Sequence, residues 1–203
     1  MVRWFAPMML AVVCGCGGSS APTVTVAPPK PTGTPTDHKD YKAWKPFPVG
    51  TTVVYKAVTK AGETSMTSVE TFKLLESTDD VIKVERQNTT ERSDLKEKAV
   101  NDAEVRTFTK TFLVPEGMKT EDFAKPSMKA KQVGTETLTI LGQPHVCEKY
   151  QWIDSTDKGP MTVTLWISPT IPGGRAKQTM IADQAGMTTV EEITTLTIPK
   201  SGS

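Results

Sequence analysis

The order of apolar and polar positions divides this chain into three parts. A short apolar run, residues 4–13, follows a single cationic side chain at Arg3 and precedes several small residues. Residues 21–36 then combine repeated Pro and Thr with almost nothing apolar to bury. From residue 47 onward, Thr, Val and Ile dominate and turn residues recur at short intervals, which is typical of a β-rich domain.

The third part of the chain is predicted to contain about nine strands. Their expected ranges are 51–59, 64–76, 81–89, 105–114, 134–141, 145–154, 161–168, 175–182 and 188–198. Short turns separate most of these segments, and a short turn can join only antiparallel neighbours. In one such turn Pro172 presets φ at the second position and Gly173 supplies a positive φ at the third.

Two segments leave their conformation open. Residues 93–100 offer an N-cap at Ser93 and helix-forming residues, but their apolar face is thin. Residues 116–131 are polar and interrupted by Pro126, so we expect one helical turn beginning near Thr120, or a flap. The expected fold is therefore mainly β. It is a single antiparallel sheet curled as an open half-barrel, or alternatively a β-sandwich, with one or two short helices.

The start of the chain indicates export. A cationic start, an apolar run too short to span a bilayer, and a small residue before Cys16 form a secretory signal. Because it ends at Cys, it resembles the bacterial lipoprotein signal, which implies cleavage before Cys16 and acylation, such as palmitate, on its thiol. Cys14 is the competing site, but bulky Val13 directly precedes it, whereas Gly15 precedes Cys16. The resemblance implies a membrane anchor with the protein facing the periplasm, and Gly17 in place of Asp implies the outer membrane.

These features give four expected segments. They are a lipoprotein signal peptide at 1–15, a lipid-anchored Pro/Thr-rich disordered linker at 16–46, a β-rich globular domain at 47–199 and a disordered tail at 200–203. A domain of roughly 150 residues buries enough surface for a core of its own.

Charge and cysteine content exclude several classes of protein. The chain has 24 Lys and Arg against 23 Asp and Glu, and loss of Arg3 with the signal leaves 23 of each. Such a neutral chain, without a basic stripe interleaved with aromatics, is not expected to bind nucleic acid. If Cys16 carries lipid and Cys14 is removed, Cys147 is the remaining thiol, so no intramolecular disulfide is expected.

The segment from Trp166 to Gly174, with its Pro-Gly-Gly turn, and the strand pair before it at 134–141 and 145–152 resemble a region of uncharacterised bacterial secreted proteins. Those proteins are similar in turn to the LolA/LolB-like group. The resemblance extends over residues 47–198. It implies an unclosed antiparallel β-barrel with a cavity that accommodates lipid.

Side chains suited to catalysis or metal binding are sparse. His145 and Cys147 share a strand face, but a metal site needs further ligands, and His38 lies in the expected linker. We therefore expect no metal and no cofactor, and interpret Cys147 as a small buried hydrophobe. Two S-x-x-K spacings, beginning at Ser93 and Ser155, lack the companion motifs of penicillin-recognising enzymes, so no catalytic residue is assigned.

Three aromatic residues are the candidate ligand-binding group. Tyr150 and Trp152 share a strand face, and Trp166 lies on the following strand, within reach of cross-strand packing. The same residues could instead form part of the core. The adjacent acids Glu191 and Glu192 point to opposite faces of a strand and cannot act together on one substrate.

The expected function is that of a lipid-anchored cell-envelope lipoprotein. It would be a non-enzymatic module that binds or carries a lipidic molecule or an envelope protein. The alternatives are an envelope hydrolase with a dispersed active site and a purely structural envelope protein. A continuous apolar interior would favour the carrier, a solidly packed core would favour protein contacts, and converging Ser, His and acidic groups would favour the enzyme.

Overall fold

The computed structural model describes residues 33–200, apart from 93–96 and 158. The signal peptide, Cys14, Cys16, the first half of the expected linker and the last three residues lie outside the described residues. The expectations about them stay predictions.

The described residues form twelve strands, two α-helices and one 3-10 helix. The strands are β1 (Thr34–Asp37), β2 (Thr52–Ala61), β3 (Thr64–Ser77), β4 (Val81–Arg92), β5 (Glu97–Val100), β6 (Glu104–Thr109), β7 (Thr111–Val114), β8 (Lys131–Ile140), β9 (Gln143–Thr156), β10 (Gly159–Ile167), β11 (Arg175–Ala182) and β12 (Met187–Thr197). The helices are α1 (Lys39–Trp44), α2 (Thr120–Ala124) and the 3-10 helix η1 (Asp183–Ala185).

Ten strands form one antiparallel sheet. Its order is β5-β4-β3-β2-β12-β11-β10-β9-β8, and β6 pairs with the other half of β4. No ladder among the described residues joins β8 to β5 or β6, so the sheet is open, while β1 and β7 form a separate two-stranded ribbon. This confirms the expected mainly β fold with one open antiparallel sheet and two short α-helices, and not the sandwich alternative.

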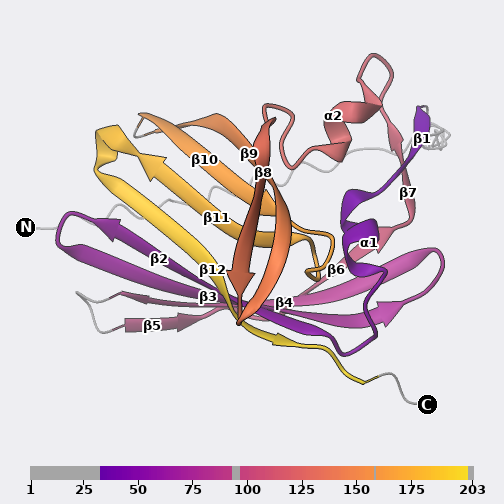
Figure 1. Ribbon diagram of the computed structural model, residues 1–203, viewed down its shortest axis with the longest axis horizontal. Helices are drawn as coiled ribbons and strands as arrows, with labels where there is room; N and C mark the ends of the chain where they lie inside the picture. Colours follow the sequence, from indigo (N-terminus) through magenta and orange to yellow (C-terminus); the bar gives the residue numbers. More distant parts are fainter. Residues whose placement is uncertain (1–32, 93–96, 158, 201–203) are drawn as a thin grey trace, which may run out of the picture. The chain divides into compact units, whose positions relative to one another are not determined.

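The sheet is bent by bulges. The register shifts between Trp166 and Ile167 on β10, between Ile193 and Thr195 on β12, and at two further points on β3 and β8. A bulge adds a residue to one strand, which bends that strand and increases its twist. Figure 1 shows the result, a strongly twisted sheet with α1, α2 and the β1–β7 ribbon gathered near one end of it.

Local sequence pattern located most of the sheet. The turn after β10 has Gly173 at φ 74°, as its sequence predicted, because this region of φ is strained for residues with a Cβ. The helical turn expected near Thr120 is α2, which begins at that residue. The expected strand at 105–114 is divided at Lys110 into β6, which joins the main sheet, and β7, which pairs with β1.

One expectation needs correction, and one segment that the sequence left open is now described in part. Residues 34–44, assigned to the disordered linker, form β1 and α1, so the folded part begins before residue 47. The conformation of residues 93–100 is open from the sequence, and their described end, 97–100, is strand β5, paired with β4. In both cases the deciding interactions come from distant parts of the chain, which a local pattern does not contain.

Helix α1 is held tightly against the sheet. His38 caps it, because His38 Nδ1 accepts a 3.2 Å hydrogen bond from the Asp40 amide. Tyr41 and Trp44 are three residues apart, so they share a helix face, and each is 5% exposed. Tyr41 Oη donates to the Asp79 carbonyl oxygen at 2.8 Å, which ties the helix to the β3–β4 turn.

Candidate functional site

A cavity of about 370 Å³ lies on one face of the main sheet. Val84 on β4 and Leu165 on β10 both line it, although β3, β2, β12 and β11 lie between those strands in the sheet order. The sheet therefore curls around the cavity, which lies on its concave face. The volume is at the lower end of the range of about 300–1,000 Å³ that is usual for ligand pockets.

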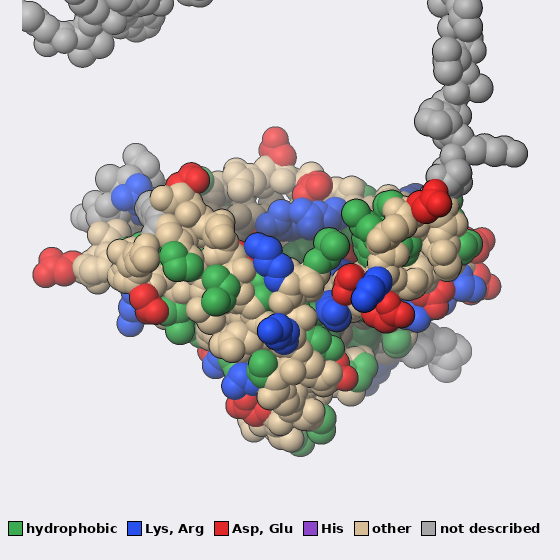
Figure 2. Space-filling view, turned by 90° about the horizontal axis from the view of Figure 1, so that it is seen from above, with side chains coloured by type: hydrophobic (Ala, Val, Ile, Leu, Met, Phe, Trp, Pro, Cys, Tyr) green, Lys and Arg blue, Asp and Glu red, His purple; other side chains and the backbone are tan. Residues whose placement is uncertain are grey.

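The walls of the cavity are mainly apolar. Residues of α1, β3, β4, β6 and β10 supply them, including Trp44, Phe72, Val84, Phe108, Leu165 and Ile167. Four charged residues also reach the surface of the cavity, namely Lys39, Asp40, Arg106 and Arg175. Figure 2 shows lysine and arginine side chains beside a hollow on one face of the molecule. Apolar walls with a few polar groups are typical of small-molecule sites.

A bulge on β11, opposite Trp166 and Ile167 of β10, directs Arg175 into the concave face. Trp166 pairs with Lys177, but the next residue, Ile167, pairs with Arg175, so Ala176 is the extra residue. Opposed residues share a face, and Ile167 lines the cavity. Without the bulge Arg175 would lie on the same face as Lys177, whose ammonium group lies 5.9 Å from the Trp166 ring centroid, away from the cavity.

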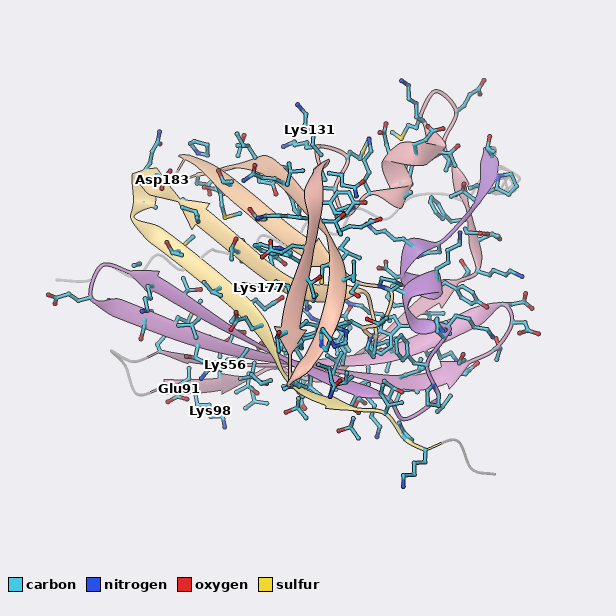
Figure 3. All side chains as sticks on the ribbon, in the orientation of Figure 1. Lys56, Glu91, Lys98, Lys131, Lys177 and Asp183 are labelled. Atoms are coloured by element: carbon cyan, nitrogen blue, oxygen red, sulfur yellow. The ribbon has the colours of Figure 1, made fainter. Side chains whose placement is uncertain are left out.

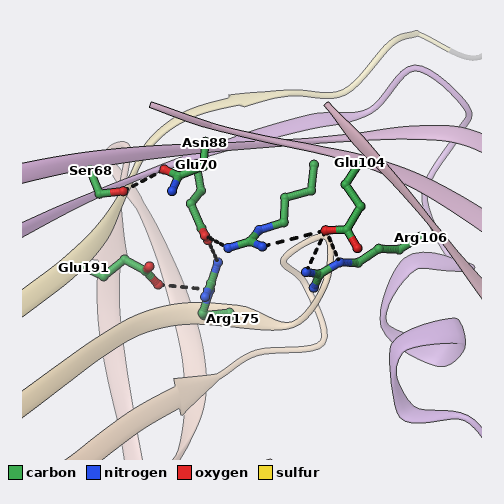
Figure 4. A network of polar contacts seen from close by, with 8 residues as sticks. Ser68, Glu70, Asn88, Glu104, Arg106, Arg175 and Glu191 are labelled. Carbon is green, nitrogen blue, oxygen red and sulfur yellow. Dashed lines mark hydrogen bonds and ion pairs between the residues drawn. The ribbon is translucent and has the colours of Figure 1, made fainter. Parts of the chain in front are cut away.

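Arg175 lies at the centre of a network of ion pairs, shown in Figure 4. Its Nη2 donates to Glu70 Oε2 at 3.1 Å, and its Nε lies 3.0 Å from Glu191 Oε1. Arg86 donates to the other oxygen of Glu70. The guanidinium carbon lies 4.2 Å from the Tyr55 ring centroid, a cation–π arrangement.

The network continues toward the rim through Glu104. Arg106 donates to Glu104 Oε2 from both Nε, at 3.2 Å, and Nη2, at 3.0 Å, and Arg86 Nη1 lies 3.9 Å from the same oxygen. The side chain of Arg106 is 41% exposed, whereas that of Arg175 is 26% exposed. The cavity thus has an exposed arginine and a more deeply placed one.

The pKa values of the two carboxylates next to Arg175 are shifted in opposite directions. Burial raises the pKa of Glu70, but hydrogen bonds and charge from Arg86 and Arg175 outweigh burial, and its pKa lies below its usual value. Burial raises the pKa of Glu191 above its usual value, and the nearby charge of Arg175 does not offset this. Glu191 Oε1 is buried without a well-aligned hydrogen bond among the described residues. Glu70 is therefore the firmly ionised partner of the arginines.

Burial also acts on the two other groups at this point. It raises the pKa of Tyr55 to about 12, so the phenol stays protonated and donates to the Arg175 carbonyl oxygen at 2.8 Å. Burial alone would lower the pKa of Arg175, but Glu191, Tyr55 and Glu70 outweigh it and raise that pKa. Arg175 is a permanent cation at the cavity wall.

Helix α1 forms one wall, and the loop after β10 packs directly against it. The Gly173 amide donates to the Ala43 carbonyl oxygen at 3.1 Å. A Cβ added to Gly173 would lie 3.1 Å from Trp44 Nε1, so glycine allows this close approach. The wall is consequently part of the rigid fold.

A second cavity, of about 350 Å³, adjoins the first. Both are lined by Lys39, Asp40 and Pro126, and the second also by Phe112 and Phe123. The Lys39 ammonium group donates to the carbonyl oxygens of Lys125, at 3.0 Å, and Pro126, at 3.3 Å. These hydrogen bonds link α1 to the segment after α2 where the two cavities meet.

The structure does not bring the three candidate aromatic residues together. Leu165 pairs with Tyr150 and Val163 with Trp152, but Trp166 pairs with Lys149, so Trp166 projects from the opposite face. Trp166 Nε1 donates to Glu136 Oε2 at 2.9 Å, and the Lys149 ammonium group lies 5.0 Å from its ring centroid. The residues that line the cavity do not include any of the three. A role for them in ligand binding stays a prediction.

Cys147 is fully buried, and burial raises the pKa of its thiol. His145, on the same strand face, is within 2.8 Å of Thr170 Oγ1 through its Nδ1, and Thr170 Oγ1 is 2.9 Å from Ser168 Oγ. Ser168 is fully buried, so these hydrogen bonds fasten the loop after β10 to β9.

The described residues contain no group of three or more His, Cys, Asp or Glu side chains arranged to hold a metal ion. None of the helices in residues 33–92, 97–157 and 159–200 is long and apolar enough to cross a membrane.

Sequence reasoning did not identify the cavity residues. Arg175 directly follows the Pro-Gly-Gly turn that the sequence did identify. Glu191 was expected to point to the opposite face of its strand from Glu192. The register confirms this, because Glu191 opposes Gln178 and Glu192 opposes Lys177. A signal was present in the charged residues Glu70, Arg86 and Glu191 inside β-rich segments, where buried positions are usually apolar.

Comparisons with known proteins give fold likenesses at low identity. No protein-family model and no curated protein matches the chain. A Bacteroides fragilis protein, provisionally described as exported with a YmcC-like fold, is 11% identical over 76% of this chain and 98% of its own, with a TM-score of 0.47. A protein of Parabacteroides distasonis, provisionally described as a lipoprotein, is 12% identical over 74% of this chain and 97% of its own, with a TM-score of 0.46.

A third structure is a domain from Vibrio parahaemolyticus, provisionally described as an outer-membrane lipoprotein-sorting protein. It is 10% identical over 75% of this chain and 86% of its own, with a TM-score of 0.26. The solved structures similar to this chain thus include proteins described as exported, as lipoproteins and as lipoprotein-sorting domains.

Proposed function

We propose that this chain is a cell-envelope lipoprotein, anchored through Cys16, whose β domain binds a lipidic ligand without catalysing a reaction. The observation that carries the binding function is the cavity on the concave face, with walls that are mainly apolar. Trp44, Phe108, Leu165 and Ile167 are among the residues that line it. A largely apolar cavity of this kind favours a carrier over a solidly packed structural protein.

Burial of the ligand's apolar part would supply most of the affinity. Each methylene group transferred from water into such a site contributes about 0.8 kcal/mol. The cavity volume of about 370 Å³ accommodates one small apolar group rather than an extended surface, so a small molecule is favoured over an envelope protein.

An uncharged probe tests the binding function. The full chain should increase the fluorescence of N-phenyl-1-naphthylamine saturably, and dodecanol should displace the dye. Ile167→Trp replaces a branched alkyl side chain in the cavity with a larger indole ring and should weaken dye binding by about tenfold or more, equivalent to about 1.4 kcal/mol. Ile153→Trp adds the same ring at a side chain that is 60% exposed and should bind the dye as the unmodified chain does. No saturable binding by the unmodified chain, or equal binding by both variants, would reject the function.

The anchor is tested separately. In the native membrane fraction, mass spectrometry of the first peptide should find Cys16 at the amino terminus with acyl chains attached. Acylation at Cys14 would establish the alternative site. An unmodified Cys16, or residues 1–15 still present, would contradict a lipid anchor.

The enzyme alternative has weaker support. Ser168, Thr170 and His145 are connected by hydrogen bonds, but the Ser168 hydroxyl is buried and would not reach a substrate. Incubation of the full chain with p-nitrophenyl esters tests this alternative, and a turnover rate that falls in Ser168→Ala would revive it.

A further inference from the structure

We propose that the ligand is an amphiphile with a single anionic head group, which Arg175 binds at the cavity wall. This inference rests on the proposed function and specifies the chemical class of its ligand. The chemistry that recognises the ligand is a carboxylate or phosphate head, joined to an apolar tail.

The charges at the cavity surface favour an anion. Lys39, Arg106 and Arg175 line the cavity, and Asp40 is the one acid among the described lining residues. The carboxylates that pair with the arginines, Glu70, Glu104 and Glu191, belong to the network behind this surface and are absent from the lining. A ligand in the cavity therefore meets more positive than negative groups.

Arg175 retains a donor for this ligand. Its Nε faces Glu191 and its Nη2 donates to Glu70, while Nη1 makes no hydrogen bond or ion pair with a residue in the described part of the chain. The guanidinium plane is held by the Tyr55 ring on one side and by two carboxylates behind it, so its orientation is fixed before the ligand arrives. A charge-assisted hydrogen bond to a fixed guanidinium is among the stronger polar contacts in proteins.

The charge of Arg175 is incompletely balanced. Glu70 is shared between Arg86 and Arg175, and the raised pKa of Glu191 shows that this side chain disfavours its ionised form. Because Glu70 is shared and the described cavity lining holds three cations and one acid, the surface around Arg175 carries an excess of positive charge. An anionic head group would complete the neutralisation in a partly desolvated site, where opposite charges attract more strongly than in water.

The apolar part of the cavity begins next to the guanidinium. The Phe72 ring centroid lies 5.5 Å from the guanidinium carbon of Arg175. Leu165, Ile167 and Phe108 continue the apolar wall. A head group on Arg175 would thus place the attached tail against apolar side chains. This arrangement matches an amphiphile better than a polar anion such as inorganic phosphate.

A matched ligand series tests the inference with the full chain. Dodecanoate, dodecyl phosphate, dodecanol and dodecyltrimethylammonium share one tail and differ in head group. Displacement of N-phenyl-1-naphthylamine should show that both anions bind about tenfold or more tightly than dodecanol, with the cation weakest. Added salt should narrow this difference, because screening weakens the charge contribution. Tighter binding of dodecyl phosphate than of dodecanoate would identify phosphate as the preferred head group. Tighter binding of dodecanoate would identify a carboxylate.

Variants then locate the preference. Arg175→Gln with Glu191→Gln removes a neighbouring opposite pair together, which avoids leaving a buried unpaired charge. In this double variant the affinity ratio of dodecanoate to dodecanol should fall to less than about threefold. Arg106→Gln, at a 41% exposed side chain, should lower the affinity ratio of dodecanoate to dodecanol partially. If the double variant does not fold, this variant decides whether arginines at the cavity cause the preference for an anion. Lys98→Gln on edge strand β5, far from α1 in Figure 3, should keep the full ratio.

The outcomes separate the two proposals. If none of the four ligands displaces the dye or binds, the proposed function fails. If dodecanol binds as tightly as the two anions, or if the double variant keeps the full preference, the cavity still binds amphiphiles but the inference about the anionic head group is wrong.

Discussion

The Arg175 carbonyl oxygen accepts a 2.8 Å hydrogen bond from Tyr55 Oη, while the guanidinium carbon of the same arginine lies 4.2 Å from the Tyr55 ring centroid. One tyrosine on β2 thus holds both the main chain and the side chain of the residue that follows the β10–β11 loop. Tyr55 is 2% exposed and belongs to the core, so the position of Arg175 depends on the core of the fold.

Tyr55→Phe should destabilise the domain by about 1–3 kcal/mol, because the Arg175 carbonyl oxygen loses its partner in a buried place. Urea unfolding of the full chain measures this change. Tyr150→Phe is the matched control. Its hydroxyl donates to Glu148 at 2.8 Å in an exposed position, so the change should stay within about 0.5 kcal/mol. Equal losses in the two variants would contradict the structural role of Tyr55.

The acids on either side of Arg175 should respond differently to loss of charge. Glu70→Gln should cost about 1.5–3 kcal/mol at neutral pH, because Arg86 and Arg175 both donate to the ionised carboxylate. Glu191→Gln should change the free energy of unfolding by less than about 1 kcal/mol, or raise it, because the buried carboxylate disfavours its charge. If Glu191→Gln loses more free energy of unfolding than Glu70→Gln, then Glu191 and not Glu70 is the main ionised partner of the arginines.

The same two acids predict opposite pH dependences. The folded pKa of Glu70 is lowered, so its contribution is complete above its ordinary value of 4.5 and is lost as pH falls through the folded pKa. The folded pKa of Glu191 is raised, so its contribution is complete below 4.5 and is lost as pH rises through the folded pKa. Urea unfolding measured from acid to neutral pH gives the free energy of unfolding as a function of pH. Glu70→Gln should remove the loss of stability at acidic pH, and Glu191→Gln should remove the loss that occurs as pH rises. Unchanged profiles would contradict these shifts.

Gly173→Ala tests the contact between the β10–β11 loop and α1. The new Cβ would meet Trp44 Nε1 at 3.1 Å, in addition to the strain of a positive φ, which costs roughly 1–2 kcal/mol. Gly142→Ala is the control, since Gly142 also has a positive φ but has nothing within 4 Å of its added Cβ. Gly173→Ala should therefore lose more stability than Gly142→Ala and should also weaken dye binding. Identical effects would show that the Trp44 contact is unimportant.

The thiol of Cys147 should react slowly while the protein is folded. It is fully buried, its pKa is raised, and its Sγ donates to the His145 carbonyl oxygen at 3.4 Å. Mass-spectrometric mapping of iodoacetamide adducts should find Cys147 labelled after unfolding and hardly before. Cys147→Ser should cost about 1–3 kcal/mol if the hydroxyl finds no partner, and more than Cys147→Ala. Rapid labelling of the native chain at neutral pH would contradict the buried position.

Alternating residue patterns were sufficient to predict most of the sheet. Strand β2 pairs over its whole length with β3 across a two-residue turn, so the residues that decide this pairing are close in sequence. The same holds for the turn at Gly173, where φ is set by the residue type. Helix α1 was missed because it has six residues and follows a Pro-rich segment, and its stability comes from contacts of Tyr41 and Trp44 with distant strands.

The cavity depends on features that no local pattern contains. Arg175 and Glu70 are 105 residues apart in sequence and meet because the sheet curls. The orientation of Arg175 depends further on a bulge at Ala176 of β11, opposite Trp166 and Ile167, which reverses the face that alternation would assign. The candidate aromatics failed to form one group for a related reason, since the register places Trp166 opposite Lys149 rather than Tyr150.

Backbone amide NMR shifts of the full chain during titration with dodecanoate give the most direct test of ligand binding in the concave cavity. Saturable changes should be largest at Ala43, Leu165, Ile167 and Gly174, which line the cavity from α1, β10 and the following loop. The exposed residue Ile153 on β9 should change little. Changes centred on Ile153 and its neighbours, or no saturable change at the cavity residues, would contradict the account.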